Sequence, residues 1–203
     1  MIEICKTAAK KMKYANVGTF EFMFEDGKFY FLEMNTRLQV EHPVTEMVYG
    51  IDLVREQIRI AAGEKLGYTQ SNLVAHGHAI EFRINAEDPE TFVPNPGTIK
   101  LYAPSGGLGV RVDSAAYTGY TIPSMYDSMI AKLIVHAQSR PACIMRAERA
   151  LDEFTIEGIK TTIPLQKKLL NNSDVRQLKT DNHWLENFLA NEHSTEEIKE
   201  NQE

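Results

Sequence analysis

The stretch FLEMNTRLQVEHPVTEM, from Phe31 to Met47, determines how the rest of this chain is interpreted. Polar and apolar residues alternate through its first half, and in an extended strand successive side chains point to opposite faces. One face would then carry five polar groups, those of Glu33, Asn35, Arg37, Gln39 and Glu41. Alternation alone favours a simpler interpretation, a half-buried strand with a solvated face.

The chemistry of this polar face favours a site for metal and phosphate. A solvated strand face usually carries Lys, Ser, Thr and Glu, whereas this one combines carboxylates, amides and a guanidinium. Carboxylate and amide oxygens are the hard ligands that Mg²⁺ prefers. A neighbouring arginine can bind an oxyanion with its planar guanidinium. The stretch therefore predicts a site that handles a divalent metal, phosphate groups and a small anion.

A further carboxylate lies just upstream, in an expected hairpin. Residues 18–24 alternate, an Asp-Gly pair at 26–27 is a hairpin signal, and residues 28–35 return as the second strand. Glu21 lies among phenylalanines, where a charge is costly unless it is paired or binds a metal. A regular two-residue loop would put Glu21 and Glu33 on opposite faces. If the two carboxylates share a metal, the loop must be odd in length or the hairpin must be bulged.

The composition is that of an ordinary soluble protein. The chain has 203 residues, of which 43% are hydrophobic and 25% are charged, and a chain of this length buries about 70% of its unfolded surface. No apolar run approaches the about 20 residues that span a bilayer, and no signal peptide is visible. Cys5 and Cys143 form neither a disulfide framework nor a metal spacing, so a reducing cytoplasm fits best. The net charge of −6 argues against nucleic acid as a partner.

The run EMNTRLQVEHPVTE closely resembles the signature of biotin carboxylases, the ATP-grasp components of biotin-dependent carboxylases. The similarity extends upstream to GTFEF and downstream through GHAIEFRINAEDP and YDSMIAKLI, so it covers about residues 1–189. The resemblance implies an α+β fold. It begins with the C-terminal part of an ATP-grasp domain, made of antiparallel strands and helices. A biotin carboxylase C-terminal domain follows, with a small sheet or barrel-like part flanked by helices.

Two domains and a tail are expected, with residues 1–75 in the first domain, 76–190 in the second and 191–203 in a disordered tail. The polar linker at 63–75 marks the boundary. Helices are expected at 2–14, 44–49, 52–62, 139–154, 162–171 and 183–189. Beyond the hairpin, strands are expected at 78–85, 99–102, 110–114 and 129–136.

The resemblance implies an enzyme that carboxylates biotin on a carrier protein, using ATP and bicarbonate by way of carboxyphosphate. The implied ligands of Mg²⁺ or Mn²⁺ are Glu21, Glu33 and Asn35, and the two glutamates also contact ATP. The implied bicarbonate and biotin contacts are Arg37, Gln39, the Val40 backbone amide and Arg83. Among these, Arg37 and Arg83 also act in catalysis, together with Glu41 as the base for the bicarbonate proton. Arg83 would stabilise negative charge on the biotin ureido oxygen.

The implied partners are a biotin carboxyl carrier protein, carboxyltransferase subunits and a second copy of the chain, with no nucleic acid and no membrane. A twofold contact is expected near Leu108, Arg111 and Asp127. The expected acceptor is acetyl-CoA, as in the acetyl-CoA carboxylase of fatty acid synthesis. Pyruvate and propionyl-CoA carboxylases remain open.

Two other interpretations stay open. The Gly-rich residues 105–109 lie between strands and not before a helix, so they do not form a phosphate-binding loop. The resemblance implies that the lobes that hold ATP in a complete biotin carboxylase are absent here, so the chain could be a non-catalytic fragment for self-association or carrier docking. A different ATP-grasp ligase, such as one that forms carbamoyl phosphate, is disfavoured by residues 39–42 and by GHAIEFRINAED.

Overall fold

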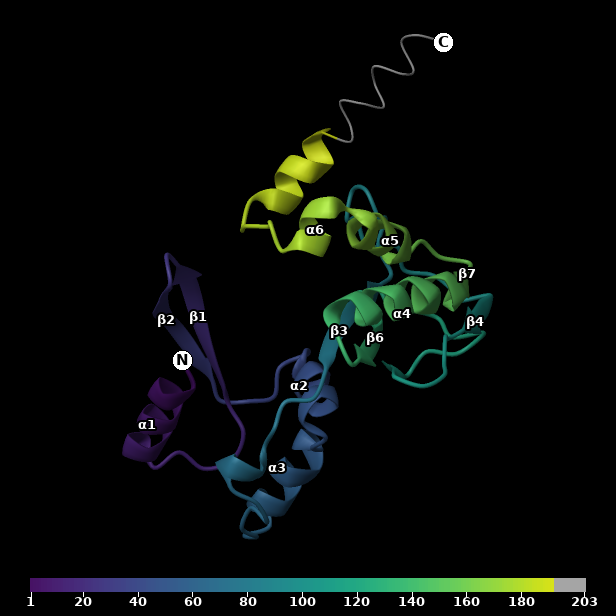
Figure 1. The fold of residues 1–203 in the computed structure, drawn as a ribbon. Helices are drawn as coiled ribbons and strands as arrows, with labels where there is room; N and C mark the ends of the chain where they lie inside the picture. The colour runs from purple at the N-terminus through teal and green to yellow at the C-terminus, as the bar shows by residue number, and fades with distance from the viewer. Residues whose placement is uncertain (192–203) are drawn as a thin grey trace, which may run out of the picture. The chain divides into compact units, whose positions relative to one another are not determined.

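The computed structural model describes residues 1–191, which divide between two compact units (Figure 1). The first unit contains residues 1–81, and the second begins at Phe82. Helices and small antiparallel sheets confirm the expected α+β class. Within the described residues, no helix has the length and apolar character to cross a membrane. Apart from its first residue, the expected tail at 191–203 lies outside the described residues.

The first unit consists of a helix, a hairpin and a pair of helices. Its elements are α1 (Ile2–Met12), β1 (Thr19–Glu25), β2 (Lys28–Asn35), α2 (His42–Tyr49), α3 (Leu53–Ala61) and a 3-10 turn (Gln70–Asn72). Gly50 separates α2 from α3 with a φ of 66°, in the left-handed region that favours glycine. Asp52 caps α3 by accepting a hydrogen bond of 2.8 Å from the Arg55 backbone N–H. The expected hairpin and three helices are confirmed.

The second strand of the hairpin ends earlier than the alternating pattern predicts. β2 stops at Asn35, and residues 36–41 form a loop. The His42 N–H donates to the Gln39 carbonyl at 3.3 Å, and Glu41 is the N-cap of α2. The prediction that five alternating polar residues share one strand face is therefore wrong beyond Asn35. Hydrogen bonds that start a helix replace the strand ladder there.

The second unit contains two small sheets and several helices. Its strands are β3 (His78–Asn85), which begins in the last four residues of the first unit, β4 (Leu101–Ala103), β5 (Val110–Ser114), β6 (Met129–Ala137) and β7 (Thr155–Glu157). Its helices are α4 (Arg140–Glu153), α5 (Ile163–Asn171) and α6 (Ser173–Gln177), and a further helix begins at Trp184. One sheet has the order β3-β6-β5, and β4 pairs with β7. The four expected strands and three expected helices are confirmed, whereas the short β7 and α6 were not predicted.

The core of the second unit forms around β6, the central strand of the three-stranded sheet. The fully buried side chains of this core include Ile84, Ile99, Leu133, Ile134, Val135 and Leu151. Ser139 caps α4 by accepting a hydrogen bond of 3.4 Å from the Ala142 N–H. The buried Cys143 thiol on α4 donates to the Val135 carbonyl of β6 at 3.2 Å. The packing of α4 against β6 thus holds the sheet.

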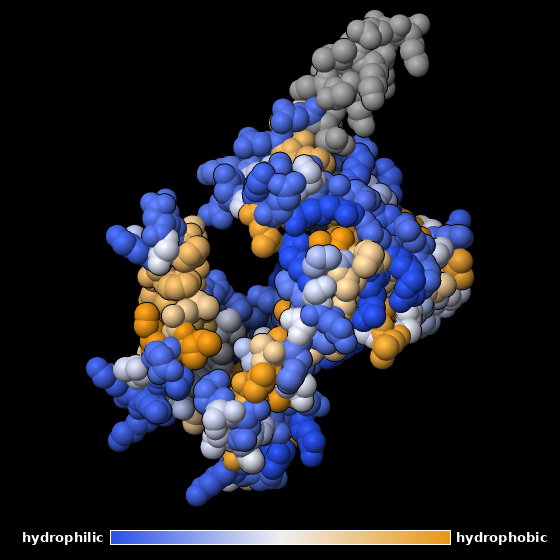
Figure 2. Space-filling model, viewed as in Figure 1, coloured by the Kyte–Doolittle hydropathy of each residue, from blue (hydrophilic) through white to orange (hydrophobic). Residues whose placement is uncertain are grey.

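The hairpin of the first unit carries a broad apolar surface, seen over β1 and β2 in Figure 2. Large side chains at least 40% exposed there are Met23, Phe24, Phe29, Tyr30, Phe31 and Leu32. The Phe22 and Phe31 rings make an edge contact with centroids 5.9 Å apart. An isolated two-stranded hairpin is marginally stable, and large exposed apolar patches mark interaction surfaces. This surface is typical of strands that pack within a larger assembly.

Candidate functional site

The hairpin brings the two predicted metal-binding carboxylates together. Glu21 of β1 lies directly opposite Glu33 of β2. The connecting loop contains only Asp26 and Gly27, whose φ angles of 49° and 75° match a type I′ turn. A regular hairpin with this loop would place the two carboxylates on opposite faces, so another feature must bring them into register.

That feature is a β-bulge at Leu32. Phe22 pairs with Phe31, whereas the preceding residue, Glu21, pairs with Glu33, which leaves Leu32 as the extra residue. The bulge shifts the register by one residue and turns Glu33 to the face of Glu21. The expectation that a shared face requires an odd loop or a bulge is confirmed.

The side chain of Asn35 bridges the paired carboxylates. Its Nδ2 donates to Glu21 Oε1 at 2.7 Å and to Glu33 Oε1 at 3.1 Å. Gln39 Nε2 donates to the same Glu21 oxygen at 2.5 Å. Two carboxylate oxygens therefore converge on one point, and two amide side chains surround them.

This donor set fits Mg²⁺. The ion is usually held by one or two carboxylates together with substrate phosphates. Rotation of the Asn35 amide would turn its oxygen toward the carboxylates in place of its nitrogen. Within residues 1–191, no group of three or more His, Cys, Asp or Glu side chains could hold a metal. A metal bound by Glu21, Glu33 and Asn35 would therefore take its remaining ligands from substrate or water.

The predicted anion-binding residues follow on the loop between β2 and α2. The Arg37 side chain is exposed, and its Nη1 donates to the Leu38 carbonyl at 3.1 Å. Val40 is half-buried, and Glu41 is exposed at the start of α2. His42 Nδ1 lies 2.7 Å from the Gln39 carbonyl oxygen and steadies the loop. The structure thus joins Gln39 to the carboxylate pair and places Arg37, Val40 and Glu41 on the same loop.

A cavity of about 420 Å³ borders this loop within the first unit. Its polar lining includes Lys6, Gln39, Glu41 and His42, and its apolar lining includes Phe20, Phe22 and Leu38. A mainly apolar pocket with a few polar groups is typical of a small-molecule site. The predicted bicarbonate contact Gln39 and the predicted base Glu41 therefore line a space that a small ligand can enter.

Arg83, the remaining predicted site residue, lies on β3 in the second unit. Its side chain is exposed, whereas its neighbours Phe82 and Ile84 are buried. The burial of these three residues fits a strand whose successive side chains point to opposite faces. Sequence reasoning missed Thr162 and Gln166, which bond to the Arg83 backbone. A threonine before a helix is a capping signal, but it does not reveal which strand the helix start will meet.

The three residues expected at a twofold contact lie in the second unit. Leu108 is 88% exposed in the Gly-rich loop. The Arg111 guanidinium donates to both carboxylate oxygens of Asp113, at 2.7 and 2.8 Å. Asp127 accepts a hydrogen bond of 2.8 Å from the Met129 N–H. Among these three residues, only Leu108 presents a large exposed apolar group.

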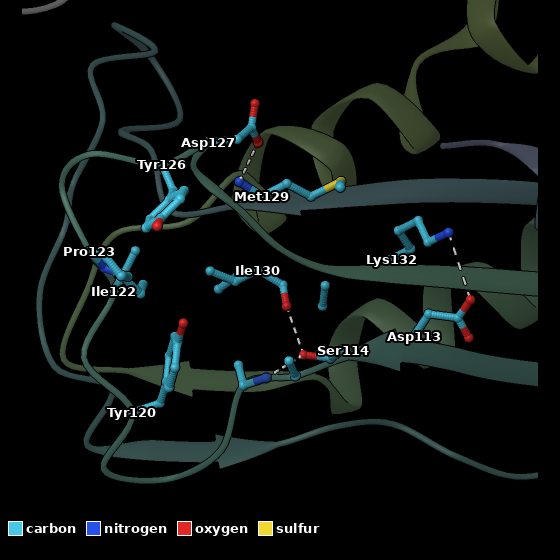
Figure 3. A pocket seen from close by; sticks show the side chains of 13 residues that line it. Asp113, Ser114, Tyr120, Ile122, Pro123, Tyr126, Asp127, Met129, Ile130 and Lys132 are labelled. Atoms are coloured by element: carbon cyan, nitrogen blue, oxygen red, sulfur yellow. Dashed lines mark hydrogen bonds and ion pairs between the residues drawn. The ribbon is translucent and has the colours of Figure 1, made fainter. Parts of the chain in front are cut away.

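A second cavity, of about 370 Å³, lies in the second unit and includes none of the predicted catalytic residues (Figure 3). Tyr120 and Tyr126 line one side of it. Asp113 and Lys132 form an ion pair at another side, with Oδ2 and Nζ 3.7 Å apart. Asp127 also borders this cavity, so one residue of the expected twofold contact lies beside it.

Comparisons with known proteins give consistent matches along the chain. Residues 81–187 match the family model of the biotin carboxylase C-terminal domain. Residues 1–69 match the ATP binding domain of the carbamoyl-phosphate synthase L chain. The biotin carboxylase of Haemophilus influenzae is 52% identical over 186 residues, which are 92% of this chain and 42% of that protein. A pyruvate carboxylase subunit of Methanothermobacter thermautotrophicus is 53% identical over 182 residues, 89% of this chain and 37% of that protein.

A solved structure extends the similarity to three dimensions. The biotin carboxylase domain dimer of Hydrogenobacter thermophilus 2-oxoglutarate carboxylase, in complex with MgADP, ADP and bicarbonate, has a TM-score of 0.89 at 48% identity. The alignment covers 91% of this chain and 41% of that chain. The 203 residues thus span less than half the length of the relatives that they match.

Proposed function

Because this chain belongs to the biotin carboxylase family, we propose that it supplies the metal and bicarbonate site of an enzyme that carboxylates biotin with ATP. The pairing of Glu21 and Glu33 across the bulge, with Asn35 bridging them, carries the proposal. Like charges directly opposite in a strand pair destabilise the pair. A hairpin that nevertheless aligns two carboxylates and an amide is suited to holding a divalent cation.

Each site residue has a role that its chemistry supports. Mg²⁺ or Mn²⁺, held by Glu21, Glu33 and Asn35, would neutralise the phosphates of ATP, and the glutamates also contact the nucleotide. Bicarbonate binds to Arg37, Gln39 and the Val40 backbone N–H. Glu41 accepts the bicarbonate proton. Arg83 stabilises the negative charge that develops on the ureido oxygen of biotin.

The organisation of the chain is consistent with this role. We assign residues 1–75 to the C-terminal part of an ATP-grasp domain and residues 76–190 to the C-terminal domain. The matches of 1–69 and 81–187 to separate family models support this division. The exposed apolar surface of the β1–β2 hairpin supports packing against further parts of an ATP-grasp domain.

The proposed partners are a biotin carboxyl carrier protein, carboxyltransferase subunits and a second copy of the chain, in the cytoplasm. The dimer reported for the Hydrogenobacter thermophilus domain supports self-association. Acetyl-CoA is the proposed final acceptor. The chain is similarly identical to a pyruvate carboxylase subunit, so pyruvate is the acceptor to test against acetyl-CoA.

A fused enzyme tests the activity. The part of the Haemophilus influenzae biotin carboxylase that precedes the region of similarity is joined ahead of Met1. With MgATP and free biotin, we expect phosphate release that requires bicarbonate. A fusion carrying both Glu21→Gln and Glu33→Gln should lose this release. The proposal would be refuted if phosphate release did not depend on bicarbonate and were equal in the wild-type fusion and the double variant.

A further inference from the structure

Strand β3 lies at the edge of its sheet, and the start of α5 bonds to its outer side. In a strand, the backbone groups of residues i and i+2 point to the same edge. Arg83 and Asn85 therefore present their N–H and C=O groups on one side, where an edge strand has no neighbouring strand to meet them. Thr162, the N-cap of α5, and Gln166, one turn later, bond to these groups.

Thr162 makes three hydrogen bonds to the backbone of β3. Its N–H donates to the Asn85 carbonyl at 3.1 Å. Its hydroxyl accepts from the Asn85 N–H at 3.0 Å and donates to the Arg83 carbonyl at 3.1 Å. The residue is only 6% exposed, so water cannot readily replace these bonds. With one N–H and one hydroxyl, Thr162 satisfies backbone groups at the edge of β3 that a neighbouring strand would otherwise bond.

Gln166 adds a second donor to the same Arg83 carbonyl. Its Nε2 lies 2.6 Å from the Arg83 oxygen. A backbone carbonyl has two lone pairs, and here a hydroxyl and an amide occupy both. The peptide group that follows Arg83 is therefore held from two directions.

These contacts hold the backbone of a residue whose side chain is exposed. The buried Phe82 and Ile84 fix the same strand from its core-facing side. Misplacing a reacting group by about 1 Å can lower the rate about 100-fold. A long side chain such as that of arginine therefore needs a backbone whose position is fixed. We propose that Thr162 and Gln166 are positioning residues that fix the Arg83 backbone and so direct its guanidinium toward the substrate. This inference rests on the proposed function, in which Arg83 contacts bicarbonate and biotin.

Nuclear magnetic resonance of the ¹⁵N-labelled 203-residue chain tests the inference. The two measured quantities are hydrogen exchange of the Asn85 amide and the Nε–H signal of Arg83, which is assigned with Arg83→Lys. Thr162→Val keeps the branched shape and removes the hydroxyl. It should raise Asn85 exchange about tenfold and shift the Arg83 signal, because the Asn85 N–H and one lone pair of the Arg83 carbonyl lose their partner. Thr162→Ser keeps the hydroxyl and should restore both quantities to wild-type values.

Gln166→Met separates the two positioning residues. It removes the amide while keeping the length of the side chain, and it should shift the Arg83 signal without changing Asn85 exchange. Thr121→Val is the matched control, because it removes a threonine hydroxyl bonded to Thr98 in the same unit. This control should change neither quantity.

Three outcomes would overturn the inference. The first is that Thr162→Val changes neither Asn85 exchange nor the Arg83 signal. The second is that Thr162→Ser changes both quantities as much as Thr162→Val does. The third is that Gln166→Met leaves the Arg83 signal unchanged. If Thr162→Val does not fold, the other two variants decide the result. Titrating bicarbonate into the wild-type chain tests the proposed function separately. A constant Arg83 signal in that titration counts against anion binding by Arg83, whereas the exchange data still decide whether its backbone is fixed.

Discussion

Glu21 lies directly opposite Glu33, although the loop that joins their strands has only two residues. The bulge at Leu32 supplies the extra residue that turns both carboxylates to one face. The Asn35 amide donates to both and offsets part of their repulsion. This relationship makes the carboxylate pair the most direct place to test the metal site.

In the fused enzyme, Glu33→Gln should remove most of the activity, because it removes one of the two charges that are proposed to hold the metal. Loss of a residue that only orients a metal ligand costs about 10–100-fold, and we expect a loss of at least about 100-fold in bicarbonate-dependent phosphate release. The unfolding temperature should change little, because Glu33 is exposed. Glu25→Gln, also exposed on this hairpin, is the control and should retain activity. Wild-type rates in Glu33→Gln would exclude Glu33 from the site.

Replacing the two site arginines should affect different parts of the reaction. In the fused enzyme, Arg37→Ala should weaken bicarbonate-dependent ATP cleavage, because Arg37 is proposed to hold bicarbonate. Arg83→Ala should reduce biotin carboxylation more than ATP cleavage, by about 10²–10³-fold, because its donors are proposed to act on the ureido oxygen. Phosphate release and carboxybiotin formation are measured in parallel, with the exposed Arg55→Ala as control. Equal losses of both activities in Arg83→Ala would contradict this division.

Self-association should depend on Leu108, whose side chain is 88% exposed. At concentrations where the wild-type chain sediments as a dimer, Leu108→Asp should sediment as a monomer, because an interface core disfavours an unpaired carboxylate. Leu178→Asp replaces another exposed leucine of the second unit and should stay dimeric. A wild-type chain that remains monomeric at high concentration would argue against a twofold contact formed by this chain alone.

Acid should destabilise the second unit through Asp88. The Lys160 ammonium donates to this carboxylate at 2.6 Å, and the Thr91 and Glu90 N–H groups donate at 3.0 Å, which together hold the pKa of Asp88 well below its ordinary value. A carboxyl pKa that is depressed in the folded state adds stability above the ordinary value of about 3.9, and this stability is lost as pH falls toward the folded-state pKa. The unfolding temperature should therefore fall as pH drops below about 4. Asp88→Asn should show a shallower fall.

Circular dichroism melting curves between about pH 7 and about pH 2 would measure this difference. Asp152→Asn removes the exposed carboxylate of a different ion pair, that with Lys167, and serves as the control. The control should keep the acid dependence of the wild type. The same pH dependence in Asp88→Asn as in the wild type would show that Asp88 contributes nothing to it.

The 203 residues alone should bind ATP weakly and produce no carboxybiotin. Mg²⁺ relies on substrate phosphates for part of its coordination, and positioning supplies most of phosphoryl-transfer catalysis. Glu21 and Glu33 therefore need a nucleotide that is held elsewhere. Phosphate release from MgATP, bicarbonate and free biotin would be followed over hours. Release above that of a Glu33→Gln chain would show that the site binds and cleaves ATP without further ATP-grasp lobes.

Local signals in the sequence were enough to predict several elements. The alternation of residues 78–85 predicted the bounds of β3, and Ser139 marked the start of α4. These predictions succeed because side-chain periodicity and capping involve neighbours within one turn or one strand. The metal site itself stays a proposal, which rests on residue types, since carboxylates and amides bind hard cations whatever fold presents them.

Long-range packing determined how those elements meet, and no local signal predicted it. The strand pattern extended past Asn35, but the hydrogen bonds of a helix start ended β2 there. The sequence required an odd loop or a bulge, and only the paired strands located the bulge at Leu32. The bond from Thr162 to Arg83 joins residues 79 positions apart. Such contacts depend on the packing of distant segments, because no local propensity specifies which backbone groups will meet across a sheet edge.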